Sequence, residues 1–359
     1  MNIEKDGFII KEKLDKELVL KITDNVAQKI VTTFPKLNLN ENEISTKLFC
    51  LNMYKAQIPE GMAEASYSYK SSSIYFNFHI ANEDLEEFAI HECLHYLQEV
   101  KNNDGNLKKM GLSSFSLLGV TGVGLNEAAV QYMAAKIIGI QPDFEKYYDI
   151  ILYTPSPSYY PIECTLLNEL IFFIGEDILI NSTYFSTNNF KQKIINLTSK
   201  KVFNQINSFF DDILKYEEKI TTLNNKILEI ENDKKITKLQ IEVFELRKKI
   251  NASFFEAQNL IIQNFFDALY EKITNLEELE TYRRKLTDFS QLIGVKDNYT
   301  FFDNYYHETM NKLEHKSNIL ENGGCETALS KKNSSLFAKL LNKIKKLISS
   351  KNIEQKEQD

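Results

Sequence analysis

The spacing of hydrophobic positions predicts a helix and then several strands in the first 80 residues. Residues 12–34 carry apolar side chains at roughly helical spacing between charged ones, which predicts an amphipathic helix. Thr46–Lys55 has strand character, and so does Glu64–Ile80, where the serines at 71–73 could turn a hairpin. The end of this stretch alternates cleanly and predicts a half-buried strand, with Ile74, Phe76, Phe78 and Ile80 on one face and Tyr75, Asn77 and His79 on the other.

Two helices are expected after the alternating strand. Asn82 is a suitable N-cap, and the acidic residues behind it suit the positive end of a helix dipole. We expect this helix to continue to about residue 100, where a polar stretch interrupts it. Gly111–Gly124 is rich in Gly and Ser and predicts a connection, followed by a second helix near Asn126–Ile138.

The first of these helices contains His91-Glu92-Cys93-Leu94-His95, which is the pattern HExxH. Side chains four residues apart on a helix stand about 5–6 Å apart on one face, so both imidazoles can reach one ion. Zn²⁺ binds His nitrogens at ~2.0–2.1 Å and, in catalytic sites, keeps one position open for water. Glu92 projects about 100° around the helix, where it can act as the base for that water. Cys93 points away from both histidines, so we expect it to be a small core residue.

A catalytic zinc needs a third protein ligand. The metzincin continuation would require Gly at 98 and His at 101, but the chain has Gln98 and Lys101 there. A glutamate from a later helix is the other option, and Glu127 in the segment GLNEAA is the best candidate. A carboxylate in the first turn of a helix could also serve only the helix dipole.

HECLH followed by GLNEAAVQYMAAK resembles the gluzincin branch of zinc metallopeptidases, whose thermolysin-like members pair HExxH with an Asn-Glu-Ala helix. The resemblance covers roughly residues 70–140. It implies a zincin-like domain in which His91, His95 and Glu127 bind zinc and Glu92 is the catalytic base.

The chain differs from thermolysin in two respects. The interval from His95 to Glu127 is longer, and Gln131 stands where thermolysin-like enzymes have an aspartate that orients a zinc-bound histidine. A glutamine carbonyl can accept the imidazole N–H without adding charge. We therefore expect Gln131, together with Asn126, to lie behind the ligands.

The proline-rich segment 155–161 predicts a loop, followed by an apolar helix over 164–174. Peptide hydrolysis needs a donor to the oxyanion, and no arginine precedes residue 247. The candidates are one strand histidine and three tyrosines in or beside the loop: His79, Tyr153, Tyr159 and Tyr160. We expect the strand Ile74–Ile80 to border the cleft, where a peptide could add as an extra strand.

The pattern changes to a helical one after about residue 200. Four apolar residues recur at alternating spacings of three and four, as in a coiled-coil seam: Ile220, Leu223, Ile227 and Ile230. A polar break at 232–235 is followed by a second series, Ile241, Phe244 and Ile250, so two antiparallel helices or one helix with an interrupted register would fit. Packing within the chain is favoured over a dimer, and another helix is expected over 252–292.

The last segments become polar and then basic. Residues 316–335 are typical of a flexible linker. Residues 336–350 form a basic amphipathic pattern that could bind an anionic membrane or a partner groove, or could pack on the chain's own helices. A polar tail covers residues 351–359.

Composition narrows the class of protein further. The chain has 359 residues, of which 43% are hydrophobic and 26% charged, as expected for a soluble globular protein of about two domains. The net charge of −7, with only three arginines, argues against a nucleic-acid partner. There is no pattern of a signal peptide or membrane span, and the four separated cysteines predict reduced thiols. We therefore expect a cytoplasmic protein, and export by a route without a signal peptide stays open.

The sequence thus predicts an α+β chain that is predominantly α. Residues 1–200 would form a zincin-like metallopeptidase domain with a small mixed sheet, and residues 201–315 a helical, coiled-coil-like module. The expected activity is zinc-dependent hydrolysis of peptide bonds in a peptide or protein substrate. The alternative is a catalytically weak or inactive zincin-like scaffold whose helical half binds a protein partner or a membrane surface. No oligomeric state is predicted.

Overall fold

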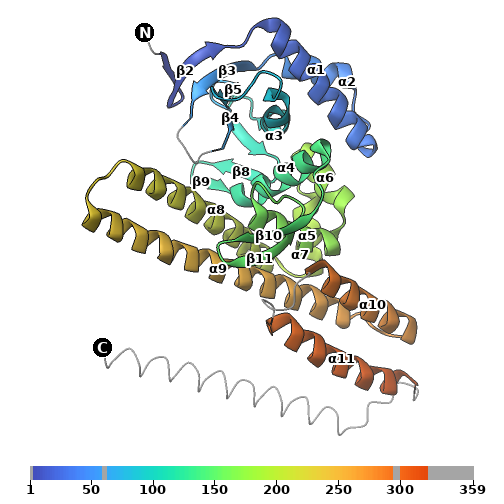
Figure 1. Ribbon diagram of the computed structural model, residues 1–359. Helices are drawn as coiled ribbons and strands as arrows, with labels where there is room; N and C mark the ends of the chain where they lie inside the picture. Colours follow the sequence, from blue (N-terminus) through green and yellow to red (C-terminus); the bar gives the residue numbers. More distant parts are fainter. Residues whose placement is uncertain (1–2, 59–62, 294–299, 322–359) are drawn as a thin grey trace. The chain divides into compact units, whose positions relative to one another are not determined.

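The computed structural model describes residues 3–58, 63–293 and 300–321, which are mostly helical with three small sheets (Figure 1). This is the predicted α+β, predominantly helical class. The linker beyond residue 321, the basic segment 336–350, the tail 351–359 and Cys325 lie outside the described residues. None of the described helices is long and apolar enough to cross a membrane.

The chain divides into two compact units, which are described separately. The first unit comprises Met1–Ala268 with Thr287–Asp303, and the second comprises Leu269–Leu286 with Asn304–Asp359. The three sheets and the HExxH helix all belong to the first unit.

The first unit begins with a five-stranded sheet in the order β1-β2-β3-β5-β4. β3 and β5 pair in parallel and the other neighbours are antiparallel. The strands are β1 (Ile3–Lys5), β2 (Phe8–Lys13), β3 (Asn52–Gln57), β4 (Ala65–Ser68) and β5 (Ser73–Asn77). The helices that accompany them are α1 (Lys16–Thr33), α2 (Glu41–Leu48) and α3 (Leu85–Leu97), and a 3₁₀ turn spans Pro35–Leu37.

Local sequence explains α1 and α2. The Asp15 carboxylate accepts a hydrogen bond from the Leu18 N–H at 2.8 Å, so the helix expected from residue 12 begins only after β2. Asn40 caps α2 in the same way, through the N–H of Glu43 at 3.2 Å. The strand expected over 46–55 is therefore wrong in its first half, because residues 46–48 complete α2 and β3 begins only at Asn52.

β5 differs from the half-buried strand that its alternation predicts. Tyr75, expected on the polar face, is fully buried. Its ring lies 5.0 Å from that of Phe8 and 5.6 Å from that of Tyr54, and its hydroxyl donates to the Asp6 carboxylate at 2.8 Å. Aromatic rings from β2 and β3 thus cover the second face, which single-sequence periodicity cannot anticipate.

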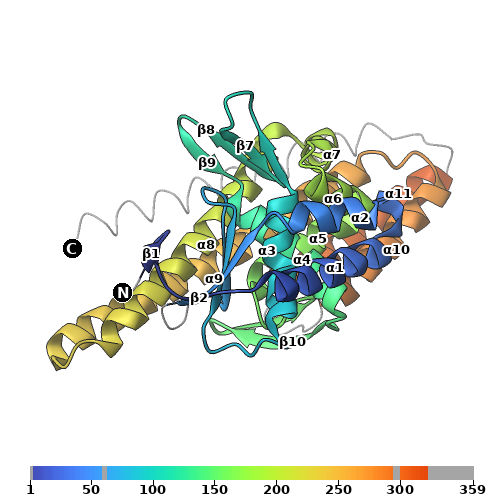
Figure 2. The same cartoon turned by 90° about the horizontal axis from the view of Figure 1, so that it is seen from above.

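Two further sheets were not predicted. A four-stranded antiparallel sheet and a separate hairpin follow α3, and Figure 2 shows strands β7 to β9 projecting from the helices of this unit. Gly111–Gly124, expected to be a connection, contains β8 and β9, whose turns use Gly111 and Gly119 at positive φ. The strands are β6 (Glu99–Lys101), β7 (Leu107–Met110), β8 (Ser113–Ser116), β9 (Gly119–Thr121), β10 (Asp143–Tyr147) and β11 (Ile150–Thr154).

α4 (Val123–Ile138) is the central helix of the first unit and contacts α1, α3, α5, α6 and α8. Gly124 allows this packing, because a Cβ atom there would lie 2.2 Å from the carbonyl oxygen of Phe210 on α8. The Asp211 carboxylate, also on α8, accepts hydrogen bonds from the N–H groups of Gly122 and Gly124, both at 2.9 Å. The neighbouring helices are α5 (Pro161–Ile174), α6 (Glu176–Tyr184), α7 (Asn189–Leu197) and α8 (Lys200–Leu228).

α8 and α9 (Asp233–Tyr270) form two helices joined by a short turn, which is the first of the two arrangements that the sequence allows. An ion pair at 2.6 Å joins Lys219 to Glu242 across the antiparallel pair. The expected seam is only partly correct, because Ile241 and Phe244 are 59% and 56% exposed. The buried stripe of α9 instead contains Val243, Leu246 and Ile250.

The long helix expected over 252–292 is interrupted, because α9 ends at Tyr270 and α10 (Leu276–Ile293) starts anew. A reciprocal cap explains the break: the Asn275 side chain accepts from the Glu278 N–H at 2.9 Å, and Glu278 accepts from the Thr274 N–H at 2.7 Å. α11 (Thr300–Glu321), which belongs to the second unit from Asn304 on, remains helical past residue 316, where the linker was expected to begin. There, the Lys316 ammonium donates to the Tyr270 carbonyl at 3.1 Å.

Candidate metal centre

Three side chains from two packed helices meet at one point in the first unit. His91 and His95 lie one turn apart on α3, and Glu127 projects from the start of α4. The His91 Nε2 atom lies 3.0 Å from His95 Nε2 and 3.2 Å from Glu127 Oε2, and His95 Nε2 lies 3.3 Å from the same oxygen. Ligands about 2.0–2.1 Å from a tetrahedral zinc stand roughly 3.3 Å apart, so this donor set fits Zn²⁺.

The three side chains are nearly buried but still reachable by solvent. Their exposed fractions are 15% for His91, 6% for His95 and 15% for Glu127. Burial alone would raise the pKa of Glu127, but the charges and hydrogen bonds of His95 and His91 hold that pKa well below its ordinary value. Burial would lower the pKa of His91, but the hydrogen bond with Glu127 and the nearby carboxylates raise it to about 9. A proton therefore competes with a metal ion for this site.

A hydrogen-bond chain behind His91 fixes the orientation of its ring. The Tyr159 carbonyl accepts from the Ser156 hydroxyl at 2.7 Å, and Ser156 Oγ accepts from Gln131 Nε2 at 2.9 Å. Gln131 must then present Oε1 to His91 Nδ1, which lies 3.0 Å away. This assigns the proton to Nδ1 and leaves the Nε2 lone pair for a metal. Ser156 was not anticipated, because its link to His91 spans three segments of the chain.

Glu92 is buried on α3 beside the three side chains. Burial raises the pKa of its carboxyl group, an effect that the charges of His91 and His95 oppose. The backbone N–H of Tyr67, on β4, donates a hydrogen bond to the Glu92 carboxylate and also opposes the rise. β4 is thus adjacent to the residue expected to act as a base. Cys93 is fully buried in the hydrophobic core, as its helical phase predicts.

Asn126 was expected to contact the side chains of the candidate metal centre, but it makes its hydrogen bonds elsewhere. It is fully buried, and its Oδ1 atom accepts from the Leu112 N–H at 2.8 Å while its Nδ2 group donates to Gln98 Oε1 at 3.5 Å. These contacts hold the turn between β7 and β8 against α4. Gly111 in this turn has φ +57°, and a Cβ atom there would lie 1.9 Å from Asn126 Oδ1. Asn126 therefore positions the sheet and not the ligands.

The four candidate oxyanion donors differ in where they lie relative to the candidate metal centre. The Tyr160 ring lies 6.2 Å from the His91 ring, at an interplanar angle of 26°. Burial and the carboxylates of Glu127 and Glu92 raise the pKa of the Tyr160 hydroxyl, so it stays protonated and able to donate. Tyr153 packs on Phe144, and His79 is exposed in a turn against Phe78.

Tyr159 is 39% exposed, and it contributes to the site through its carbonyl group, which accepts from Ser156. Of the candidate donors, Tyr160 is thus the one whose ring the structure places against a histidine of the centre. Its backbone is in the left-handed region, with φ +51°, directly before Pro161 at the start of α5. This conformation is uncommon for a tyrosine.

Comparison of the chain with protein-family models, with curated proteins and with solved structures found no match. The resemblance to gluzincins therefore rests on the two short motifs. What supports a function for this chain is the convergence of His91, His95 and Glu127, together with the groups around them.

Proposed function

We propose that the chain is a zinc-dependent peptidase with a zincin-like, gluzincin-type domain in which His91, His95 and Glu127 bind Zn²⁺. The observation that supports this is the separation of 3.0–3.3 Å between their three ligand atoms. In the described part of the chain the group has these three members, and no fourth His, Cys, Asp or Glu joins it. Structural zinc sites use four protein ligands, whereas catalytic sites use three and leave a position for water. The set of three favours catalysis.

Each neighbouring side chain has a role in this proposal. Zn²⁺, when bound, would lower the pKa of a water molecule toward ~7 and polarise the scissile carbonyl. Glu92 accepts a proton from the attacking water and delivers it to the leaving amine, and its raised pKa suits both transfers. Gln131 and Ser156 hold the His91 ring in position. The Tyr160 hydroxyl donates to the oxyanion.

The substrate strand would pair with β4 and not with the strand expected from the sequence. β5 pairs with β3 on one side and β4 on the other, so neither of its edges can accept a peptide. β4 is the last strand of its sheet among the described residues, and its Tyr67 N–H reaches Glu92. An extended peptide added to this edge would lie beside the metal centre.

The proposal is tested by the substitution Glu92→Gln. We expect the variant to bind zinc as the parent chain does, while its cleavage of a mixed peptide library falls at least 10³-fold, because the general base is lost. Glu83→Gln, at an exposed position before α3, is the control and should cleave normally. Retained cleavage by Glu92→Gln would reject the assigned base. If the parent chain binds zinc but cleaves nothing in the library, the catalytically weak scaffold becomes the better description.

A further inference from the structure

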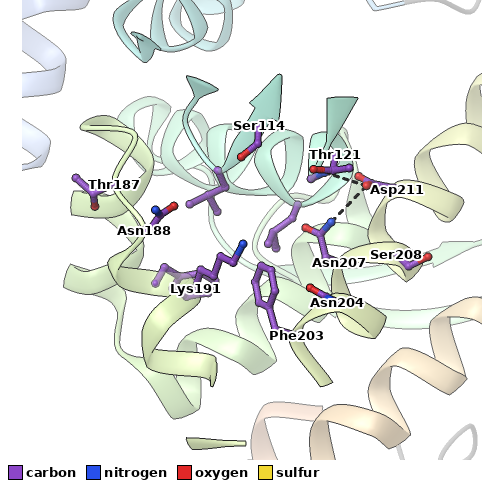
Figure 3. Close-up of a pocket in the computed structure, with 14 residues that line it drawn as sticks. Ser114, Thr121, Thr187, Asn188, Lys191, Phe203, Asn204, Asn207, Ser208 and Asp211 are labelled. Carbon is purple, nitrogen blue, oxygen red and sulfur yellow. Dashed lines mark hydrogen bonds between the residues drawn. The ribbon is translucent and has the colours of Figure 1, made fainter. Parts of the chain in front are cut away.

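A second site lies at the N-terminal end of α4, where β8, β9, α7 and α8 surround a pocket of about 380 Å³ (Figure 3). This volume is in the range of sites that bind small ligands. Its lining combines an apolar floor with a polar rim and does not include the ligand atoms of the metal centre. The floor includes Leu125 and Phe203, and the rim includes Asn188, Lys191, Asn204 and Asn207.

The pocket contains one uncompensated positive charge. Figure 3 shows the side chains of Lys191 and Phe203 next to one another, with the ammonium group 5.1 Å from the centre of the ring. Lys191 is half-buried, and its ammonium has no ion-pair partner among the residues that the structure describes. Lys109 lies close enough for the charge of Lys191 to lower its pKa, after the larger effect of burial. The electrostatic potential here therefore favours an anion.

The one carboxylate in the lining is already satisfied. Asp211 accepts hydrogen bonds from the N–H groups of Gly122 and Gly124 at the start of α4, and from Asn207 Nδ2 at 3.4 Å. The positive end of the α4 dipole compensates its charge. Asp211 is thus unsuited to bind a cation, and the single ammonium of Lys191 matches a ligand with one negative charge better than one with two, such as a phosphate dianion.

We propose that this pocket binds a monocarboxylate that carries an apolar side chain, which is the chemistry of an N-acyl amino acid or of the carboxyl end of a peptide. The carboxylate pairs with Lys191, and the apolar side chain lies against Phe203 and Leu125. Asn188 Oδ1 accepts from Lys109 and Asn207 Nδ2 donates to Asp211, so Asn188 Nδ2 and Asn207 Oδ1 are the amide atoms left for the adjoining peptide unit. β9 is the last strand of its sheet among the described strands and ends at the pocket with Thr121, so a longer peptide could continue along its edge.

The test uses the full chain and ligand-observed NMR titrations with N-acetyl-leucine and N-acetyl-leucinamide, in which an uncharged carboxamide replaces the carboxylate. We expect the acid to bind at least 10-fold more tightly than the amide. Lys191→Gln should reduce binding of the acid to the level of the amide. Lys193→Gln, at an exposed position on the same helix, is the matched control and should bind as the parent chain does.

Two further variants locate the site. A carboxylate could also bind at the metal centre, and His91→Ala tests this alternative. If the carboxylate binds in the pocket, the variant should keep the affinity of the parent chain for N-acetyl-leucine. Asn204→Trp, on the exposed rim, should block the pocket and abolish binding while circular dichroism shows a folded chain. Equal affinity for acid and amide, full binding by Lys191→Gln, or loss of binding in His91→Ala would each overturn the proposal.

A third probe distinguishes the two sources of such a carboxylate. An acetylated tripeptide ending in leucine with a free carboxyl group is compared with N-acetyl-leucine. Tighter binding of the tripeptide identifies the end of a polypeptide that continues along β9. Equal binding identifies the small N-acyl amino acid as a sufficient ligand.

Discussion

Gln131 is the residue on which the orientation of His91 depends. Its Nε2 group donates to Ser156, which leaves Oε1 to accept the N–H of the His91 imidazole. A neutral amide thus orients the ring, where thermolysin-like enzymes use a carboxylate. A neutral acceptor fixes the ring as well as a charged one, but it raises the basicity of the histidine less.

Removing this acceptor should weaken metal binding. We expect Gln131→Ala to reduce zinc affinity 10- to 100-fold, measured by competition with a chromophoric chelator, because His91 loses the partner of its Nδ1–H. Gln141→Ala, at an exposed position just after α4, is the matched control. An unchanged affinity in Gln131→Ala would show that the ring is held by packing alone.

The hydroxyl group of Tyr160 should affect catalysis without affecting metal binding. We expect Tyr160→Phe to lower kcat about 10²-fold, with zinc content and KM little changed, because only the donor to the oxyanion is removed. Tyr159→Phe keeps the carbonyl group that accepts from Ser156 and should retain normal activity. If Tyr159→Phe is the variant that loses activity, the donor has been assigned to the wrong tyrosine.

The residues of the centre differ in how far the sequence could predict them. His91, Glu92 and His95 were predictable because their relation is set by the geometry of a single helix. Glu127 required a guess about which later helix would meet α3. Ser156 and the Tyr67 N–H could not be found, because their roles come from segments brought together only by folding. Asn126 was misplaced for the same reason: its neighbours in sequence say nothing of its contact with Leu112.

At the scale of elements, the sequence predicted helices better than strands. α3, α4 and α5 were predicted with errors of a few residues, because apolar spacing is a local signal. The cap expected at Asn82 is wrong, because the N-cap of α3 is Asp84, whose side chain makes no capping hydrogen bond. β8 and β9 were missed since each has three or four residues, and their Gly and Ser content is typical of a loop. The break between α9 and α10 depends on a cap at Asn275 that interrupts an otherwise continuous apolar pattern.

The contact between α5 and α9 includes a buried acid whose ionisation should control stability. Glu169 is 2% exposed and accepts from Gln258 Nε2 at 2.7 Å, while its Oε2 atom has no partner among the described residues. Burial raises its pKa from 4.5 to about 8, although the hydrogen bond from Gln258 opposes the rise. Between these values the folded chain binds more protons than the unfolded chain, so the stability contributed by this group falls as pH rises from 4.5 to 8.

Glu169→Gln should remove this dependence. We expect the variant to be more stable than the parent chain at pH 8, by roughly 1–3 kcal/mol, and similar to it near pH 5, where the acid is protonated in the fold. Urea denaturation at both pH values measures the difference. Glu256→Gln, exposed on α9, is the control. If the free energy of unfolding differs from that of the parent chain by the same amount at both pH values, packing and not ionisation of Glu169 determines the effect on stability.

At the scale of the whole chain, the proposed metal ligands come from two helices that are distant in sequence, so bound zinc would join α3 to α4 within the first unit. An ion that binds only the folded form stabilises it by mass action, by about 2.7 kcal/mol at 100 times its Kd. For a unit of this size, that should raise the unfolding temperature by several degrees.

We therefore expect removal of metal with a chelator to lower Tm in calorimetry, and added zinc to restore it. His91→Ala should be insensitive to both treatments, because one ligand is missing. If the chelator lowers Tm equally in the parent chain and in His91→Ala, the stabilising ion binds elsewhere, and the assignment of this centre as the zinc site fails.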